Sequence, residues 1–291
     1  MSLVPHLGVG LGLRPRYTAE ILAGAADELD FFEALSENYM VPGGKPRRVL
    51  SQVRERVPLV LHGVSLNIGS VDPLDAGYLR ELAALAARSE PAWISDHLCW
   101  TGVGGHNAHD LLPLPYTDEA LRHVVPRIAQ VQDALGQRIA IENVSSYLAY
   151  TQDAFAECEF LAAVAQQADC GILLDVNNVF VSACNHAFDP RAYLAAIPPE
   201  RVFQIHLAGH SQNGPLRIDC HDAPICEEVW ELYADAIHHV GPISTLIERD
   251  DAFPPLAELL EEAARARAIL EECHASACRS AATPVATDLR T

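Results

Sequence analysis

Six strand-like stretches of the chain each end in a residue that can bind a metal ion. These residues recur at intervals of roughly 30–45 positions, which is the length of one strand–helix unit. Because the residues that follow parallel strands meet at one end of the sheet, this spacing predicts a single crevice lined by imidazole and carboxylate groups. The six residues are His62, His97, Glu142, Asp175, His206 and Glu248.

The charge balance of this crevice indicates what it would bind. Three acidic members of the set and Asp219, in the loop after the seventh predicted strand, would bring four negative charges together. Such an arrangement costs many kcal/mol unless the carboxylates are protonated or matched by cations. No lysine follows any of these strands, and Arg249 is the only arginine directly beside a strand-end residue. Metal ions are therefore the natural counter-charge.

Neighbouring residues enlarge the set of candidate ligands. One ion takes about four to six ligands, so a larger set predicts two or three ions that share carboxylates such as Glu142. Imidazole and carboxylate ligands without thiolate suit iron, manganese or zinc, and the spacing does not choose among these metals. The predicted metal ligands are His62, His97, Glu142, Asp175, Asn178, His206, His210, Asp219, His221 and Glu248.

The elements that must position these residues alternate between short aliphatic runs and longer helical patterns. Predicted strands are Gly8–Leu13, Phe31–Leu35, Leu59–Leu61, Trp93–Ser95, Ile139–Ile141, Ile172–Leu174, Val202–Ile205 and Thr245–Ile247. Predicted helices are Tyr78–Arg88, Asp118–Leu135, Ala154–Gln167, Glu227–His239 and Leu256–Glu272, with Asp72 and Thr117 as helix starts and Gly136 and Gly241 as helix stops.

This alternation predicts an α/β fold, a (β/α)8 TIM barrel formed as one domain by residues 1–274. The small, polar residues 275–291 predict a flexible, disordered tail. An open doubly wound sheet is the alternative. However, Pro15 and Arg16 follow the glycines of Gly8–Gly12 where a phosphate-binding turn needs its third glycine.

Composition narrows the classes of partner and the compartment. The chain has 291 residues and a formal net charge of −19, which argues against binding to nucleic acid or to anionic membrane surfaces. The N-terminus does not resemble a signal peptide, and no apolar run is long enough to span a membrane. Eight cysteines without a paired framework fit a reducing compartment, so a cytoplasmic protein is expected.

The segments around the candidate ligands resemble those of the multinuclear non-heme iron-dependent oxidative enzymes, a family long catalogued only as a domain of unknown function. The resemblance covers about residues 5–272 and is nearest to the branch that makes bufferin-type or methanobactin-type copper-binding peptides. The segments that carry it are Leu61–Leu66 (LHGVSL), Ser95–Leu98 (SDHL), Ile141–Val144 (IENV), Leu174–Asn178 (LDVNN), Ile205–His210 (IHLAGH) and Ile247–Asp250 (IERD).

This resemblance implies a barrel that holds two or three iron ions, as Fe2+ and Fe3+, and uses O2 as co-substrate. The implied reaction oxidises cysteine residues of a ribosomally made precursor peptide, which a separate leader-binding partner protein presents. The ten residues above would be the metal ligands. Asp96, Asn143 and Asp250 would support catalysis by orienting those ligands through hydrogen bonds.

Two segments lie where a peptide could reach the mouth of the barrel. One is the group Glu33, Glu37, Asn38 and Tyr39 after the second strand, and the other is the glycine-rich loop Gly102–Leu114. The histidines of that loop suit a lid or a substrate contact better than metal ligation. The acidic surface would favour a basic leader or partner face.

Two other functions stay open. The order of ligands also resembles the three-zinc site of apurinic endonucleases and related sugar isomerases, which predicts a zinc-dependent hydrolase or isomerase on the same barrel. Asn178, where the endonuclease pattern prefers histidine, and the −19 charge count against a DNA substrate. The third possibility is a metal carrier without catalytic activity.

Overall fold

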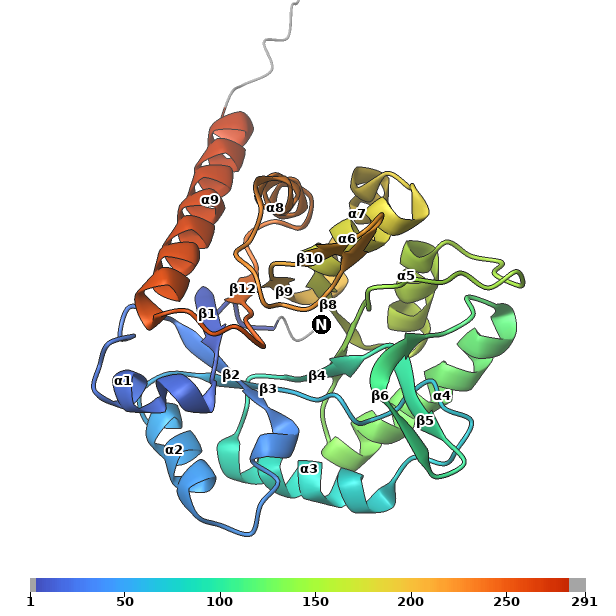
Figure 1. Ribbon diagram of the computed structural model, residues 1–291, viewed down its shortest axis with the longest axis horizontal. Helices are drawn as coiled ribbons and strands as arrows, with labels where there is room; N and C mark the ends of the chain where they lie inside the picture. Colours follow the sequence, from blue (N-terminus) through green and yellow to red (C-terminus); the bar gives the residue numbers. More distant parts are fainter. Residues whose placement is uncertain (1–3, 283–291) are drawn as a thin grey trace, which may run out of the picture.

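The computed structural model describes residues 4–282, which form a closed barrel of eight parallel strands surrounded by helices (Figure 1). The predicted TIM-barrel fold is therefore confirmed. Around the barrel, the strands follow the order β1-β12-β9-β8-β7-β4-β3-β2, and β1 closes the ring by pairing with both β2 and β12. These strands are β1 (Val9–Gly12), β2 (Phe31–Leu35), β3 (Leu59–His62), β4 (Ile94–His97), β7 (Ile139–Glu142), β8 (Gly171–Asp175), β9 (Val202–Leu207) and β12 (Ser244–Ile247).

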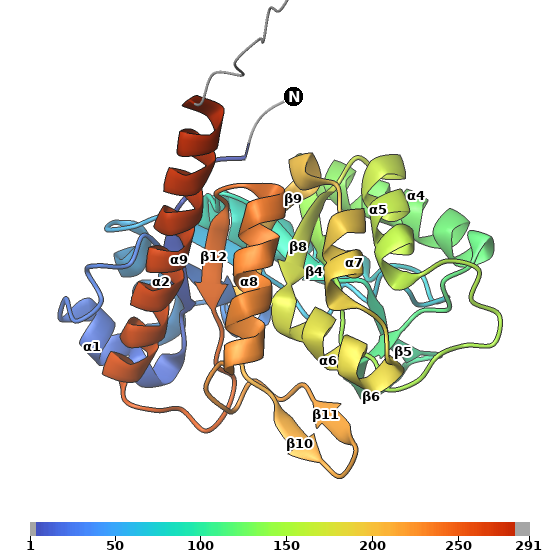
Figure 2. The same cartoon turned by 90° about the horizontal axis from the view of Figure 1, so that it is seen from above.

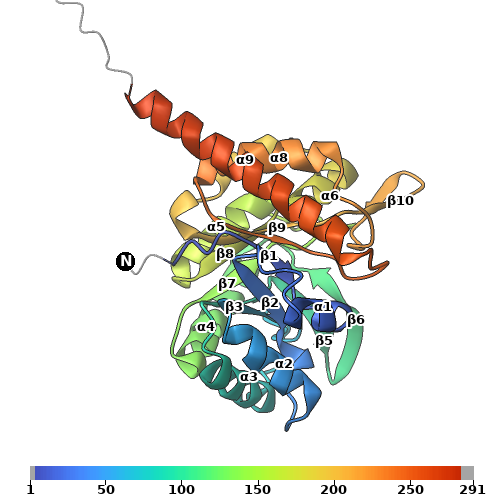
Figure 3. The same ribbon diagram turned by 90° about the vertical axis from the view of Figure 1, so that its left-hand side faces the viewer.

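The helices form the outer layer, in which α8 and α9 pack side by side (Figure 3). The helices are α1 (Thr18–Leu22), α2 (Lys45–Arg54), α3 (Ala76–Ser89), α4 (Asp118–Leu135), α5 (Glu157–Gln167), α6 (Val176–His186), α7 (Pro190–Ala196), α8 (Glu227–Val240) and α9 (Leu256–Ala282). Short 3-10 helices cover Pro15–Tyr17, Ser36–Asn38 and Pro199–Arg201. Among the described residues, no helix is long and apolar enough to cross a membrane.

Capping residues end α4 where the sequence predicts, but α3 begins at a different residue. The Thr117 side chain accepts a hydrogen bond from the Ala120 amide at the start of α4, and Gly136 ends that helix with a φ of 67°. However, α3 begins after Asp75, whose carboxylate accepts from two backbone amides, and Asp72 does not start a helix. Asp75 lies at the position where its side chain can satisfy the first free amides of the helix.

The C-terminal helix α9 continues to Ala282, beyond the start of the tail predicted at residue 275. Its last turns contain several alanines, and alanine has the highest helix propensity. Small residues are typical of disordered tails as well, so composition alone does not distinguish a helix end from a tail. Residues 283–291 of the predicted tail lie outside the described residues. In Figures 1 and 2 this helix extends past the end of the barrel.

Two β-hairpins extend from the carboxyl end of the barrel (Figure 2). The first pairs β5 (Cys99–Val103) with β6 (His106–Pro113), and the second pairs β10 (Ser211–Asn213) with β11 (Leu216–Ile218). The segment Gly102–Leu114, which the sequence predicts to be a loop, therefore lies mostly in a strand. Its polar, glycine-rich sequence hides the alternation that usually indicates a strand.

The barrel interior is built in two layers. The lower layer is an apolar cluster that includes Phe31, Val60 and Leu173, all fully buried. Because side chains along a strand point to the same face every second residue, the residues two positions further along point into the same interior. Strand register then places His97 opposite Glu142, and Asp175 opposite His206. The upper layer is therefore polar: Glu33, His62, His97, Glu142, Asp175, His206 and Glu248, all buried.

Candidate metal centre

The polar layer contains four overlapping groups of side chains that could each hold a metal ion, and in each group one ligand atom per residue lies within 4.8 Å of the others. All of these side chains are buried. Glu142, Asp175, His206 and Glu248 each belong to two groups, so the groups form one continuous cluster. The groups are His62–His97–Glu142, Glu142–Asp175–His206, Asp175–His221–Glu248 and Glu33–His206–Glu248.

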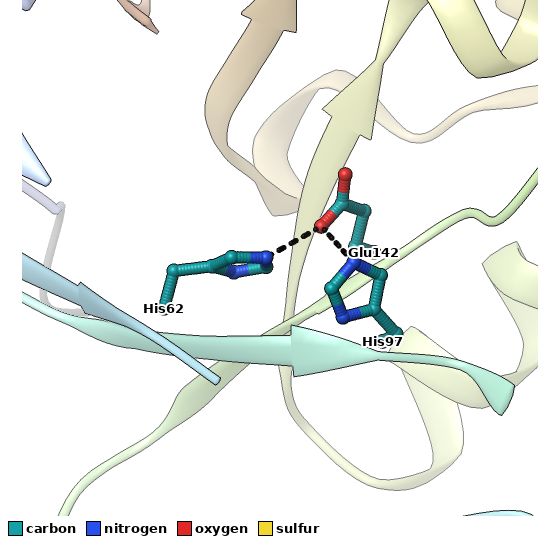
Figure 4. A group of neighbouring side chains, drawn as sticks. All are labelled: His62, His97 and Glu142. Atoms are coloured by element: carbon teal, nitrogen blue, oxygen red, sulfur yellow. Dashed lines mark ion pairs between the residues drawn. The ribbon is translucent and has the colours of Figure 1, made fainter. Parts of the chain in front are cut away.

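On one side of this cluster, two imidazoles converge on a single carboxylate oxygen (Figure 4). The Nε2 atoms of His62 and His97 each lie 3.2 Å from Oε2 of Glu142. The other ring nitrogens are held in place, because Nδ1 of His62 lies 2.9 Å from the Ser95 hydroxyl and Nδ1 of His97 lies 3.1 Å from the Gly63 carbonyl. Both rings therefore turn Nε2 towards the cluster.

On the other side, imidazoles and carboxylates from five different segments meet. Nδ1 of His206 lies 3.1 Å from Oε2 of Glu248 and 3.5 Å from Oε1 of Glu142. His221 brings Nδ1 within 3.4 Å of the same Glu248 oxygen and Nε2 within 3.9 Å of Oδ2 of Asp175. These contacts join the ends of β8, β9 and β12 to the loop that follows β11.

Six buried side-chain atoms in this cluster have no hydrogen-bond partner among residues 4–282, although oppositely charged atoms lie near several of them. Buried polar atoms are rarely left unsatisfied, so a set of them aimed at one space needs an explanation such as a bound ion. These six atoms belong to five side chains, each of which can offer a lone pair to a metal ion, His221 from one ring nitrogen at a time. The residues present therefore fit a metal centre. The atoms are Oε2 of Glu142, Oδ2 of Asp175, Oδ1 of Asn178, Nδ1 of His206, and Nδ1 and Nε2 of His221.

The pKa shifts show how strongly the cluster attracts positive charge. Burial alone would lower the pKa of His206, yet the carboxylates of Glu33, Glu248 and Glu142 raise it well above its usual value. Burial opposes a similar shift of His97, whose pKa rises to about 9 beside Glu142. Protons thus supply the counter-charge when no cation is bound, and a metal ion would compete with them.

The remaining predicted ligands lie at different depths of the site. Nε2 of His221 lies 2.7 Å from Oδ1 of Asp219, and both residues line the same cavity of about 390 Å³ as Asn178. His210 lies apart from all four groups. Its Nδ1 contacts Oδ1 of Asn177 at 2.8 Å and its ring lies 5.2 Å from that of Phe180, so the structure does not bring it together with the others.

Asp96 and Asn143, two of the three residues predicted to orient ligands, form hydrogen bonds with backbone groups. The two carboxylate oxygens of Asp96 accept hydrogen bonds from the amides of His97 and Leu66. The amide side chain of Asn143 both donates to the Asp175 carbonyl and accepts from the Asp175 amide, each at 2.9 Å. These bonds fix the ends of β4 and β8, which carry candidate ligands.

Asp250, the third, lies at the rim of the cluster. One carboxylate oxygen contacts Arg14, and the other lies 3.4 Å from Nδ1 of His221. Arg14 also donates to Oε1 of Glu248 at 3.0 Å and lines the cavity. The count of charges from the sequence omits Arg14, although it follows the first strand, and Arg249 pairs instead with Glu262 of α9.

Glu33 lies elsewhere than the sequence predicts. The sequence predicts it at the mouth of the barrel, but it lies inside the barrel, 4% exposed, with Oε2 3.0 Å from Nε2 of His206. The two-residue period from the buried Phe31 would have indicated this, because both side chains must then face the interior. Glu37 is partly buried and accepts hydrogen bonds from the Val64 amide and the Tyr78 hydroxyl.

The fold and site define a TIM-barrel protein with a buried, multi-carboxylate site suited to metal ions. Residues 8–271 match the profile of the RiPP precursor modification enzymes MbnB/TglH/ChrH, and the chain belongs to this family. RiPPs are ribosomally synthesised and post-translationally modified peptides.

Two bacterial relatives support the family assignment. The chain is 57% identical over 278 residues to a UPF0276 protein of Anaeromyxobacter sp. strain Fw109-5, covering 96% of this chain and 98% of the relative. It is 53% identical over 268 residues to a UPF0276 protein of Caulobacter vibrioides strain NA1000, covering 92% and 96%.

Solved structures at low identity share the fold. A xylose isomerase-like TIM barrel/4-hydroxyphenylpyruvate dioxygenase fusion protein matches with a TM-score of 0.62 at 15% identity, covering 98% of this chain and 46% of that chain. Endonuclease IV from Thermus thermophilus matches with a TM-score of 0.59 at 19% identity, covering 92% and 100%. These similarities concern the fold alone, which is a xylose isomerase-like barrel.

Proposed function

We propose that this protein is a multinuclear iron enzyme that uses O2 to oxidise cysteine residues of a precursor peptide, in bufferin-like or methanobactin-like biosynthesis. The observation that carries the proposal is the buried cluster of five metal-binding side chains with six atoms that have no hydrogen-bond partner among residues 4–282. Membership of a family of RiPP precursor modification enzymes supports a peptide as the substrate. The resemblance of the motifs supports oxidation at cysteine with the help of a leader-binding partner.

In this proposal, two or three iron ions are held by carboxylates that they share. Glu142 belongs both to the group with His62 and His97 and to the group with Asp175 and His206, so it is the natural bridging ligand. Asp175 and Glu248 would complete a further position with His221. Asn178 and Asp219 line the same cavity and would add ligands there, whereas the contacts of His210 give it no such part.

Bound iron would supply two properties that zinc does not combine: an open position for a substrate thiolate and the ability to pass electrons to O2. The residues of the chain supply the surroundings. The cavity is also lined by apolar residues, among them Leu35, Leu111 and Val144, which would exclude water around a substrate side chain. Cys220 lies in the same lining, but its thiol is directed to Oδ1 of Asp222 at 2.7 Å, which leaves the ligand positions to the substrate.

The hairpin β5–β6 gives the peptide a route to this cavity, because Asp110 and Leu111 of β6 form part of the lining. The net charge of −19 favours a basic leader or a basic face on a partner protein. The cysteines that the structure describes are all free, which supports the reducing cytoplasm as the proposed location.

A zinc-dependent hydrolase or isomerase is the second candidate. The same imidazole and carboxylate donors suit zinc, and the charge of the cluster would be matched equally well. Zinc would activate water for hydrolysis and would leave a peptide thiol unoxidised.

A reaction with the peptide separates these candidates. Iron-loaded protein would be mixed with a cysteine-containing peptide encoded beside its gene, together with any partner protein encoded there. We expect O2 to be consumed and the peptide to change mass at cysteine, so that alkylation of that cysteine fails. Unchanged peptide and no O2 uptake by the fully iron-loaded protein would overturn the proposal.

A further inference from the structure

A chain of four buried side chains leads from the apolar layer of the barrel to the metal cluster. Nε1 of Trp93 donates to Oε1 of Gln204 at 2.6 Å, and Nε2 of Gln204 donates to Oε2 of Glu33 at 2.7 Å. The same Glu33 oxygen lies 3.0 Å from Nε2 of His206. None of these four residues is more than 4% exposed, so water does not compete for the bonds.

We infer that Glu33 is a positioning residue that holds the His206 imidazole in one tautomer, with Nε2 protonated and Nδ1 free to bind metal. This inference rests on the proposal that the cluster holds metal ions. Glu33 would then not bind an ion itself but would be hydrogen-bonded to His206, which does.

The direction of each hydrogen bond follows from the first donor in the chain. The Trp93 indole can only donate, so the atom of Gln204 that faces it must be the carbonyl oxygen. The amide nitrogen of Gln204 must then face Glu33, where it donates to the carboxylate. An ionised carboxylate only accepts hydrogen bonds, so Nε2 of His206 must also be a donor. The lone pair of a neutral His206 ring is therefore on Nδ1.

The unsatisfied atoms agree with this assignment. Nδ1 of His206 is one of the buried atoms without a hydrogen-bond partner among residues 4–282, whereas Nε2 of His206 and both oxygens of Glu33 are not in that set. Nδ1 faces Glu142 and Glu248, two of the three carboxylates shared between metal groups.

The alternative is that Glu33 itself binds an ion, because Glu33, His206 and Glu248 are close enough to form a metal group. The Gln204 contact argues against it. A cation on Oε2 of Glu33 would lie beside the hydrogen that Gln204 directs at the same oxygen, and the two positive charges would repel. A carboxylate that accepts from the outer nitrogen of a metal-binding histidine is the usual arrangement around such ligands.

A Co2+ titration of the anaerobic protein tests this assignment, because the visible absorption of Co2+ reports on its ligands. In Glu33→Gln, a neutral amide oxygen replaces the charged carboxylate oxygen as the acceptor for His206, so the hydrogen bond that orients the ring is weakened. We expect the variant to bind as many Co2+ ions as the wild type, with one affinity lowered about 10–100-fold and an altered visible spectrum. Trp93→Phe, which frees only the Gln204 amide, should change the spectrum in the same direction but less. Glu227→Gln, in an exposed pair with Arg265, is the matched control and should change neither quantity.

Two results would overturn the inference. Loss of one whole Co2+ ion in Glu33→Gln would make Glu33 a ligand, and unchanged affinity and spectrum would give it no part in the site. If Glu33→Gln does not fold, Trp93→Phe decides the question by the same two measurements. Different results would contradict the proposed function: a wild-type protein that binds no Co2+, or an iron-loaded protein that leaves the peptide unchanged.

Discussion

Replacing the shared carboxylate Glu142 by glutamine should weaken metal binding at more than one position. Oε2 of Glu142 lies 3.2 Å from both His62 and His97, and Oε1 lies 3.5 Å from His206. Glu142→Gln keeps the shape of the side chain but removes the negative charge that would lie between ions. Loss of a residue that only supports a ligand costs about 10–100-fold in metal affinity, so loss of this ligand should cost at least about 100-fold.

This affinity change translates into a measurable difference in stability. At a free metal concentration of about 1,000 Kd, binding stabilises the folded protein by about 4 kcal/mol, and at about 10 Kd by only about 1.4 kcal/mol. A 100-fold loss therefore removes about 2.7 kcal/mol of metal-dependent stability. For a chain of this size, that corresponds to roughly 5–10 °C in Tm.

The assay is thermal unfolding under argon, with and without Fe2+, for the wild type, Glu142→Gln and the surface control Glu227→Gln. Each protein is compared with its own chelator-treated form, so any effect of the substitution on the metal-free fold cancels. We expect the metal-induced rise in Tm to be smaller by roughly 5–10 °C in Glu142→Gln and unchanged in the control. An equal rise in the wild type and Glu142→Gln would refute the argument that Glu142 is a shared ligand.

Three further predictions concern Glu157, which lines a different cavity, and two residues beside the site. Burial raises the pKa of Glu157 to about 8 from its ordinary 4.5. The stabilising effect of the protonated side chain is therefore complete below pH 4.5 and is lost as pH rises towards 8. In urea unfolding, this loss of stability should be about 1–3 kcal/mol smaller in Glu157→Gln than in the wild type. Arg14→Met leaves a buried ion pair without its cation and should cost about 3–5 kcal/mol in metal-free protein, but clearly less in metal-loaded protein, again by urea unfolding. A Cβ on Gly209 would lie 1.9 Å from the carbonyl oxygen of Ala223, so Gly209→Ala should displace the loop that carries His221 and lower metal affinity in a Co2+ titration.

Each of these predictions has an outcome that contradicts it. The pH argument fails if wild type and Glu157→Gln lose stability in parallel between pH 4.5 and 8. Equal losses for Arg14→Met with and without metal would show that Arg14 and the ions do not share the task of neutralising Glu248. For Gly209→Ala, the control is Gly43→Ala, whose Cβ would meet nothing within 4 Å, and equal metal affinity in the two variants would contradict the steric argument.

The barrel and most of the metal cluster could be predicted because both depend on regular spacing. Buried parallel strands leave continuous aliphatic runs, and the first polar residue after each run marks the end of the strand. The side chains of His62, Glu142 and Asp175 were found by this means, and the structure brings them into one cluster. No knowledge of contacts was needed, because strand ends in a closed barrel must lie together.

The parts that were not predicted depend on contacts that spacing does not reveal. Glu33 stands inside a strand rather than after it, so its place could be recognised only from the two-residue period within β2. Helix α6 begins directly after Asp175, and its apolar residues are buried on several sides, which hides the helical period. His210 shares a segment with His206, but its ring packs on Phe180 of α6, and only the folded structure shows this.

The central claim is that the buried cluster holds several iron ions, and metal analysis of anaerobically purified protein from iron-rich cells tests it most directly. We predict two or more irons per chain, lost on replacing Glu142 or Asp175 by alanine and retained on replacing Glu227 by glutamine. Stoichiometric zinc without iron, retained even when the cells are rich in iron, would contradict the claim and favour the zinc-dependent hydrolase or isomerase.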